Sequence, residues 1–292
     1  MRVTESLMFN ELTSNTNTAS SAYNTAEEEL STGKSLTAAS DNPTAANQAM
    51  TINAMLTDIS QYQTNANTAS SSLKEASSQL NSVENLMSQA RTIAVAAANT
   101  GTTDSSSQQS YASQIGDIIT QITNLANTQY DGQYIFSGTA TNVEPYTPGD
   151  ASYTYKGNGG AINAQLGPST SVQTNVPGDT VFQSAFTALS QLQSDITAGN
   201  GSAISNTDLT ALDSATNTIS QTQAQLGVTI NQVTNNQSLL STTQINYQNN
   251  LASDEDADIA TTYVQLETAQ NTYQASLESI SQAMKYSLAD YL

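Results

Sequence analysis

One long heptad pattern constrains the fold more than any other feature of this sequence. From Ile52 to Ala97, apolar or aromatic residues recur at alternating spacings of four and three, which predicts a long helix packed along other helices. Asn42 as N-cap and Pro43 as the first helical residue mark its start, and residues 99–103 mark its end. The seam consists of Ile52, Met55, Ile59, Tyr62, Ala66, Ala69, Leu73, Ala76, Leu80, Val83, Met87, Ala90, Ala94 and Ala97.

The predicted helix is too long for a globular chain of this size. At 1.5 Å per residue, residues 43–98 would span roughly 80 Å. A compact sphere of 292 residues would be only about 50 Å across. The sequence therefore predicts an elongated molecule.

Further segments show the same helical period. Residues 1–33 carry a thin seam, a third helix follows the turn near residue 103, and helical spacing returns from Phe182 to Leu192. A helix over 207–251 has polar residues in part of its seam, which we expect to specify register. A last helix is expected to begin at the acidic residues 253–256, which suit a helix N-terminus.

Between these helices lies a segment of different composition. Residues 131–180 hold most of the glycine and proline and short alternating pieces such as 153–155, which predicts β-hairpins. The predicted fold class is mainly α: an elongated, antiparallel, coiled-coil-like helical bundle with a small inserted β domain. Three domains are expected: terminal helices 1–42 and 253–292, a central bundle of 43–130 with 181–252, and the insertion 131–180.

The charge of the chain argues against two classes of partner. Six Lys and Arg stand against 25 Asp and Glu, a formal net charge of −19. Nucleic acid and anionic membranes both require a basic face, so neither is expected as a partner. The N-terminus lacks an apolar signal region, and no run of about 18 apolar residues occurs. By these two criteria alone, the expected location is the cytoplasm.

No motif indicates catalysis, a cofactor or a metal. The chain has no His and no Cys, so general base catalysis at neutral pH would need a strongly shifted carboxylate, Lys or Tyr. The run Gly33-Lys34-Ser35 is similar to the end of a phosphate-binding loop, but Glu28 replaces the required first glycine. Acidic residues at 254, 256 and 258 have calcium-loop spacing, but Ile259 replaces the glycine.

Three segments carry a resemblance to a known family. The run LSTGKSLTAASDNPTAANQAM at 30–50 and the segment from Asp256 to Leu292 resemble the two ends of the flagellin family. Residues 226–231, LGVTIN, are similar to an element near its middle. Ser35 stands where a basic residue is common, and the usual Arg of the middle element is missing.

Other details resemble the branch of that family that joins hook to filament. They are the start MRVT, the run YIFSGT at 134–139 followed by Pro145-Tyr146, and the end SLADYL. The resemblance implies a flagellin-like fold and an extracellular flagellar protein, exported unfolded through the flagellar type III apparatus. It implies a ring of identical subunits. The implied partners are copies of itself, hook-associated protein 1, flagellin and a cytoplasmic export chaperone.

The terminal helices are the predicted assembly surface. Phe9, Leu12, Leu30, Ile259, Leu266, Leu277, Ile280, Met284 and Leu288 are its expected contacts. Alternatively, these residues only close a monomeric core. A filament flagellin, or a secreted helical effector or adhesin, is also compatible with the sequence; an enzyme fits least.

We predict that residues 1–33 are disordered in the monomer. About four large seam residues, at roughly 2 kcal/mol each on burial, must offset the ordering of a whole helix at about 1 to 2 kcal/mol per residue. Neighbouring subunits would supply the missing burial. Hydrogen exchange on the purified monomer measures this, and full protection of residues 1–33 would contradict it.

Overall fold

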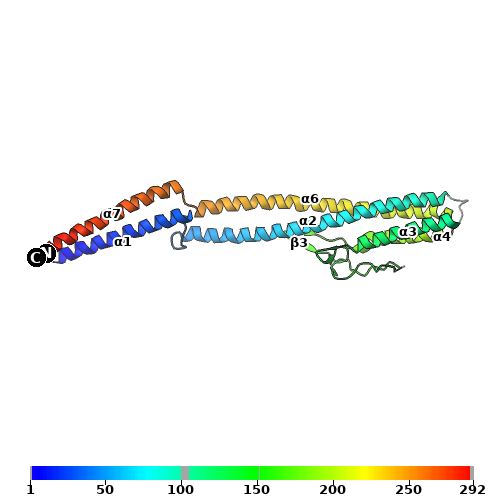
Figure 1. Ribbon diagram of the computed structural model, residues 1–292, viewed down its shortest axis with the longest axis horizontal. Coiled ribbons are helices and arrows are strands. Elements are labelled where there is room, and N and C mark those ends of the chain that lie inside the picture. Colours follow the sequence, from blue (N-terminus) through cyan, green and yellow to red (C-terminus); the bar gives the residue numbers. More distant parts are fainter. Residues whose placement is uncertain (1, 100–104, 151, 290–292) are drawn as a thin grey trace. The chain divides into compact units, whose positions relative to one another are not determined.

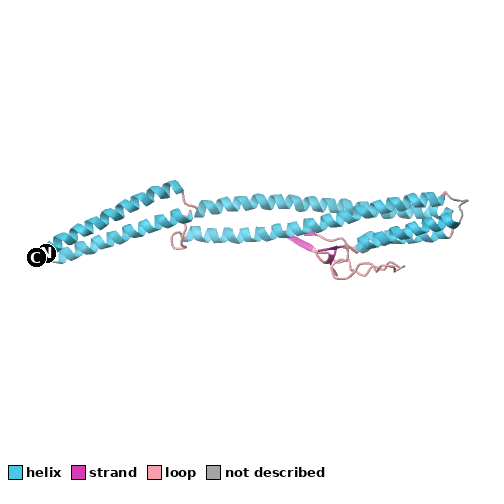
Figure 2. Cartoon of the chain, viewed as in Figure 1, coloured by secondary structure: helices cyan, strands magenta, loops and turns pink. Residues whose placement is uncertain are grey.

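A computed structural model describes residues 2–99, 105–150 and 152–289, and side chains within 6–284. The chain divides into two compact units, residues 59–241 and residues 1–58 with 242–292. Short strands lie beside the long helices (Figures 1 and 2). The elements are α1 (Arg2–Thr32), α2 (Pro43–Ala98), α3 (Ser105–Ala126), β1 (Gln129–Tyr130), β2 (Gln133–Tyr134), β3 (Asn163–Gly167), β4 (Thr170–Gln173), α4 (Gly178–Thr197), α5 (Gly201–Ala203), the π-helical turn η1 (Ile204–Asp208), α6 (Leu209–Glu255) and α7 (Ile259–Ala289).

The start of α2 is confirmed as the sequence predicts it. The Asn42 Oδ1 atom accepts a hydrogen bond from the backbone N–H of Ala45 at 3.1 Å, which caps the helix. Pro43 is the first helical residue, where its missing N–H costs nothing.

The boundary between α6 and α7 differs from the expectation. Residues 253–255, which include the acidic Asp254 and Glu255, end α6 instead of beginning the last helix. The N–H of Asp256 still donates to the carbonyl of Ala252. Asp258 caps α7, because its side chain accepts from the Ala260 N–H at 3.0 Å and bonds Thr261. The predicted start was wrong because several acidic residues close together suit a helix N-terminus, and only the path of the chain selects one of them.

In the unit of residues 59–241, α2 and α6 pair antiparallel with a constant register. Arg91 bonds Asp213 at 2.7 Å and Ser220 donates to Glu84 at 2.7 Å. The Gln237 side chain donates to Asn67 at 2.8 Å. The step back along α2 from position 91 to position 67 equals the step forward along α6 from position 213 to position 237. Gln237 is one of the polar seam residues expected to specify register.

The predicted seam of α2 is the core of this unit. Its members from Ala66 to Ala97 are all buried, as are Ile52 and Ile59, whereas Met55 is exposed and Tyr62 is half-buried. Facing them on α6 are buried residues at a spacing of seven: Leu212, Ile219, Leu226, Val233 and Leu240. Helices α3 and α4 pack on each other and add their own buried faces to the same core.

The insertion is held by aromatic packing more than by strands. Its strands form two separate antiparallel pairs, β1 with β2 and β3 with β4. Residues 153–155, expected in a hairpin, form no strand. Tyr153 instead stacks on Phe186 at 4.9 Å between ring centroids, and the Tyr155 hydroxyl donates to the Phe136 carbonyl at 2.9 Å. Alternating aromatic and polar residues fit either a strand or a loop anchored by its aromatic side chains. Here Tyr153 anchors a loop to α4.

Among the described residues, no helix combines the length and the apolar character needed to cross a membrane.

We predict that Leu80→Ala destabilises residues 59–241 far more than Leu239→Ala. Leu80 has no exposed surface, whereas Leu239 is 62% exposed. The buried change should lower the free energy of unfolding by about 2 to 5 kcal/mol, and the exposed change by less than about 0.5 kcal/mol. Denaturant unfolding followed by circular dichroism measures both, and equal losses would contradict the described core.

Candidate assembly interface

The helices that contain the two ends of the chain pair with each other. Helix α1 packs along α7, and the two run side by side (Figure 1). Tyr23 and Tyr273 stack across the pair, with ring centroids 6.3 Å apart. Two helices that contact each other along their length in this way form one continuous surface.

The contact line between α1 and α7 includes many small residues. On α7 it follows the heptad line of Leu266, Tyr273 and Ile280, whereas a second apolar line through Leu277 and Met284 is exposed. On α1, Ala19 and Ala26 are buried, and Leu12 and Leu30 beside them are half-buried. On α7, the facing residues are Thr262, Leu266, Ala269, Tyr273, Ser276, Ile280 and Ala283, which are all buried or half-buried. Small side chains let the two helix backbones approach closely, because little volume separates them.

A polar joint ends this pair on one side. Gly33 adopts the left-handed conformation, with φ of 71°, and its N–H donates to the Glu29 carbonyl at 2.8 Å. The Lys34 ammonium donates to Glu255 at 2.7 Å, and both the hydrogen bond and the charge of Glu255 raise the pKa of Lys34. The Ser35 N–H donates to the Glu255 carbonyl at 2.7 Å, and the Ala257 N–H donates to the Gly33 carbonyl at 2.9 Å. The Gly33-Lys34-Ser35 run therefore links the end of α1 to the end of α6.

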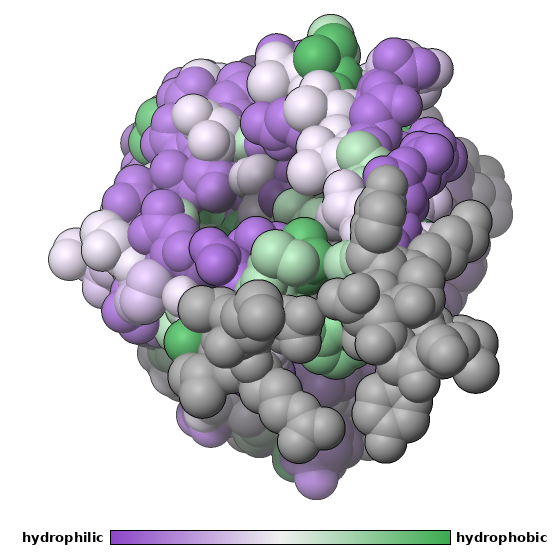
Figure 3. All heavy atoms as spheres, turned by 90° about the vertical axis from the view of Figure 1, so that its left-hand side faces the viewer, coloured by the Kyte–Doolittle hydropathy of each residue, from purple (hydrophilic) through white to green (hydrophobic). Residues whose placement is uncertain are grey.

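Apolar side chains also point away from the contact line. Phe9, Ile259, Leu277 and Met284 are between 44% and 53% exposed. Figure 3, which views the molecule from the left-hand side of Figure 1, shows green hydrophobic atoms at the surface among purple hydrophilic ones. We call the exposed residues Phe9, Ile259, Tyr263, Leu277 and Met284 the outer apolar set.

The structure thus divides the predicted assembly residues into two groups. Leu12, Leu30, Leu266 and Ile280 lie half-buried between α1 and α7. Phe9, Ile259, Leu277 and Met284 are exposed, and Leu288 falls outside the described side chains. Leu7, Met8 and Val264 are exposed as well and were missed, because they lie off the heptad lines.

The terminal pair has very little core of its own. Within the described side chains of α1 and α7, the buried residues are Ala19, Ala26 and Thr262. Large exposed apolar residues gathered beside so small a core are typical of a surface that another molecule covers.

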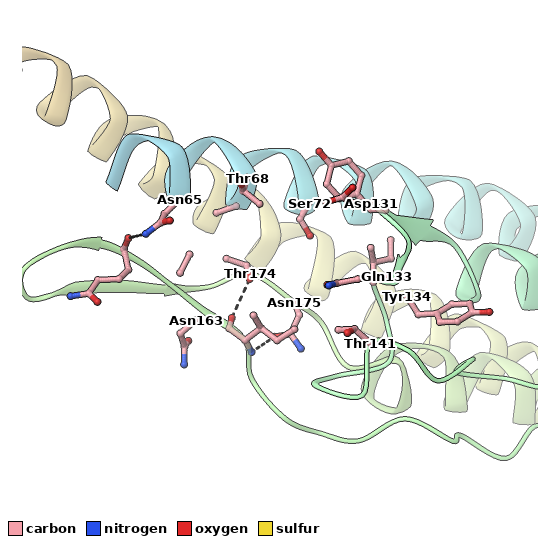
Figure 4. A pocket seen from close by; sticks show the side chains of 16 residues that line it. Asn65, Thr68, Ser72, Asp131, Gln133, Tyr134, Thr141, Asn163, Thr174 and Asn175 are labelled. Atoms are coloured by element: carbon pink, nitrogen blue, oxygen red, sulfur yellow. Dashed lines mark hydrogen bonds between the residues drawn. The ribbon is translucent and has the colours of Figure 1, made fainter. Parts of the chain in front are cut away.

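A second candidate is a hollow of about 570 Å³ between α2 and the insertion (Figure 4). Several of its polar side chains form hydrogen bonds with other parts of the chain. Asn65 donates to the Gln165 carbonyl at 2.9 Å, and Asn175 Oδ1 accepts from the Ile162 N–H at 2.8 Å. Among the described residues, no group of three or more acidic, His or Cys side chains could hold a metal. The polar groups of the hollow therefore fasten the insertion to α2 and order its loops.

Comparison with known families finds two matches, one at each end of the chain. The family described as the bacterial flagellin N-terminal helical region matches residues 3–141. The bacterial flagellin C-terminal helical region matches residues 209–292. Both helices of the α1–α7 pair lie almost entirely within these matches. No curated protein matches the sequence significantly.

Several solved structures share the fold. FlgL of Bacillus cereus is 22% identical, with a TM-score of 0.61, and the match covers 69% of this chain and 99% of that one. Flagellar hook-associated protein 3 of Legionella pneumophila is 15% identical, with a TM-score of 0.61 over 70% of this chain and 97% of that one. FlgL of Xanthomonas campestris is 14% identical, with a TM-score of 0.61 over 69% and 99%.

We predict that Ala26→Leu separates α1 from α7, whereas Ala22→Leu does not. Ala26 is buried in the contact line, and Ala22 on the same helix is exposed. The larger side chain at position 26 should cost about 1 to 3 kcal/mol through overpacking. Hydrogen exchange of residues 12–30 in the assembled protein, where both helices are expected to be ordered, measures the effect. Equal exchange in both variants would contradict the described contact line.

Proposed function

Because this chain belongs to the bacterial flagellin family, we propose that it is a structural subunit of the bacterial flagellum that joins hook to filament. In this proposal, identical copies form a ring through coiled-coil packing of their terminal helices. Residues 1–42 and 253–292 form the inner assembly domain, residues 43–130 with 181–252 form the central bundle, and the insertion 131–180 lies outward.

The observation that carries the proposal is the outer apolar set beside a minimal core. Tyr263, Leu277 and Met284 lie on one heptad line of α7 and are all exposed. Each such side chain contributes about 1.5 to 3 kcal/mol when it is fully buried. Covering the set with the α1 and α7 helices of neighbouring copies would therefore stabilise both the ring and the terminal pair.

Three sequence details favour the junction over the filament. They are the start MRVT, the run YIFSGT at 134–139 and the end SLADYL, which resemble the junction branch of the family. The shared fold with structures of FlgL and of hook-associated protein 3 agrees with this choice.

The proposed partners follow from this position in the flagellum. The ring would contact hook-associated protein 1 on one side and flagellin on the other, and an export chaperone would hold the chain in the cytoplasm. The protein would reach the cell exterior through the flagellar export apparatus, without a cleaved signal. The proposed role is mechanical and needs neither catalysis nor a cofactor.

The described terminal helices correspond to the ordered form of these segments. Their disorder in the free monomer stays a prediction. In the proposal, covering the outer apolar set provides the free energy that orders them.

We predict that Leu277→Asp blocks assembly and leaves residues 59–241 folded. Leu277 is exposed, so a charge there is solvated in the monomer but would be buried between copies. Ser279→Asp is the matched control, because Ser279 is also exposed and lies about 200° around the helix from Leu277. Ile280→Asp should also block assembly, by breaking the contact with α1. Sedimentation and cell motility measure the effects; assembly of L277D at the level of S279D would contradict the proposed surface.

The location itself is tested by immunogold electron microscopy of flagellated cells with antibody against residues 131–180. A single band of gold between hook and filament is the expected result. Gold along the whole filament would make the chain a filament flagellin. Absence of flagellar label, with antibody binding confirmed on the purified chain, would favour a secreted effector or adhesin.

A further inference from the structure

An acidic side chain occupies a core position at the turn that connects α4 to α6. The turn runs through Gly199 and Asn200 into α5 and η1, and Asn200 caps α5 by accepting from the Ala203 N–H at 3.3 Å. Asp208 is the last residue of η1. It precedes the buried residues Leu212, Ala215 and Ile219 at spacings of four, three and four, so it lies where the α6 seam favours an apolar side chain.

Asp208 is buried without a partner. The residue is only 1% exposed, and neither carboxylate oxygen has a hydrogen-bond partner. A buried, unpaired carboxylate is costly, and it lowers that cost by binding a proton or an opposite charge. In the described ion pairs, the basic side chains bond other acids: Lys34 bonds Glu255, and Arg91 bonds Asp213.

The charges around Asp208 are negative. Asp195, in the last turn of α4, is the charged group that acts on it, and η1 packs against α4. Asp179 lines the same groove between α4 and α6, but it lies in the first turn of α4, at the opposite end of that helix from Asp195. The last turn of α4 contains no basic residue, and the C-terminal end of a helix carries partial negative charge.

The two acids are not equivalent. Asp195 accepts from the Gln191 side-chain amide at 2.8 Å and from that of Asn200 at 3.4 Å. Asp195 therefore has hydrogen-bond donors of its own. Asp208 has no such donors, so a proton shared by the pair resides on Asp208.

We propose that Asp208 and Asp195 hold one proton between them, with the protonated Asp208 carboxyl donating to the Asp195 carboxylate. This proton fastens the α4–α6 turn, and its loss leaves a negative charge on the buried Asp208 beside the half-buried Asp195. The turn is therefore a pH-sensitive element of the bundle, tight in mild acid and looser at neutral pH and above. This inference is independent of the role proposed for the terminal helices.

The direction of the pH effect follows from the folded state. Burial, and then the charge of Asp195, raises the pKa of Asp208 from 3.8 to about 6. The folded turn thus binds the proton more tightly than the open chain does, and its stabilisation is complete below pH 3.8 and lost as pH rises through about 6. A pKa shift of this size changes the equilibrium constant between the folded and the open turn by roughly 100-fold over the whole pH range. About tenfold of this change falls between pH 5 and pH 8.

The test is hydrogen exchange of residues 192–212 in the full chain, expressed as protection factors so that the intrinsic pH dependence cancels. In the wild type, protection should fall about tenfold from pH 5 to pH 8. Asp208→Asn should remove this fall. Asp195→Asn should move it to lower pH, which keeps the proposal testable even where D208N does not fold. Asp117→Asn, at an exposed position on α3, should behave as the wild type.

Two results would overturn the proposal. One is the same pH dependence in D208N as in the wild type. The other is recovery of full protection at pH 8 when excess calcium chloride is added to the wild type but not to D208N, which would make the pair a cation site.

Discussion

The antiparallel pairing of α2 with α6 is the contact on which the rest of this structure depends. Polar side chains hold one register from the Arg91–Asp213 pair to the Asn67–Gln237 pair, and the apolar seam residues of both helices fill the space between them. The buried alanines of α2, together with Leu80, Val83 and Met87, belong to this core. With α3 and α4 packed on the same core, residues 59–241 have a core that the terminal helices do not.

The terminal pair shows the opposite balance of forces. Its fully buried residues are two alanines and a threonine. Its large apolar side chains are half-buried in the contact line or exposed outside it. The Lys34–Glu255 ion pair fastens the joint but, as a half-exposed pair, contributes little to stability. A segment of this kind is suited to gain its free energy from neighbouring copies, in line with its membership of the flagellin family.

The sequence predicted the helices well because their signals are local and repeated. Asn42 and Pro43 fix the start of α2, and the seam from Ala66 to Ala97 follows from the heptad repeat alone. The division of the assembly residues could not be predicted. Leu277 and Ile280 both satisfy the heptad pattern, but their exposure depends on how α7 turns toward α1. Likewise, the spacing places Asp208 in a seam, but it does not predict that the carboxylate lacks hydrogen-bond partners, because that depends on how α4 packs against the turn.

The central claim is that neighbouring copies cover the outer apolar set, and the oxidation of Met284 tests it directly. Met284 is 52% exposed and Met87 has no exposed surface, so peroxide should oxidise the first in the free chain and spare the second. In flagella isolated with the protein in place, the account predicts that Met284 becomes as resistant as Met87. Equal oxidation of Met284 in the free chain and in the flagellum would contradict it.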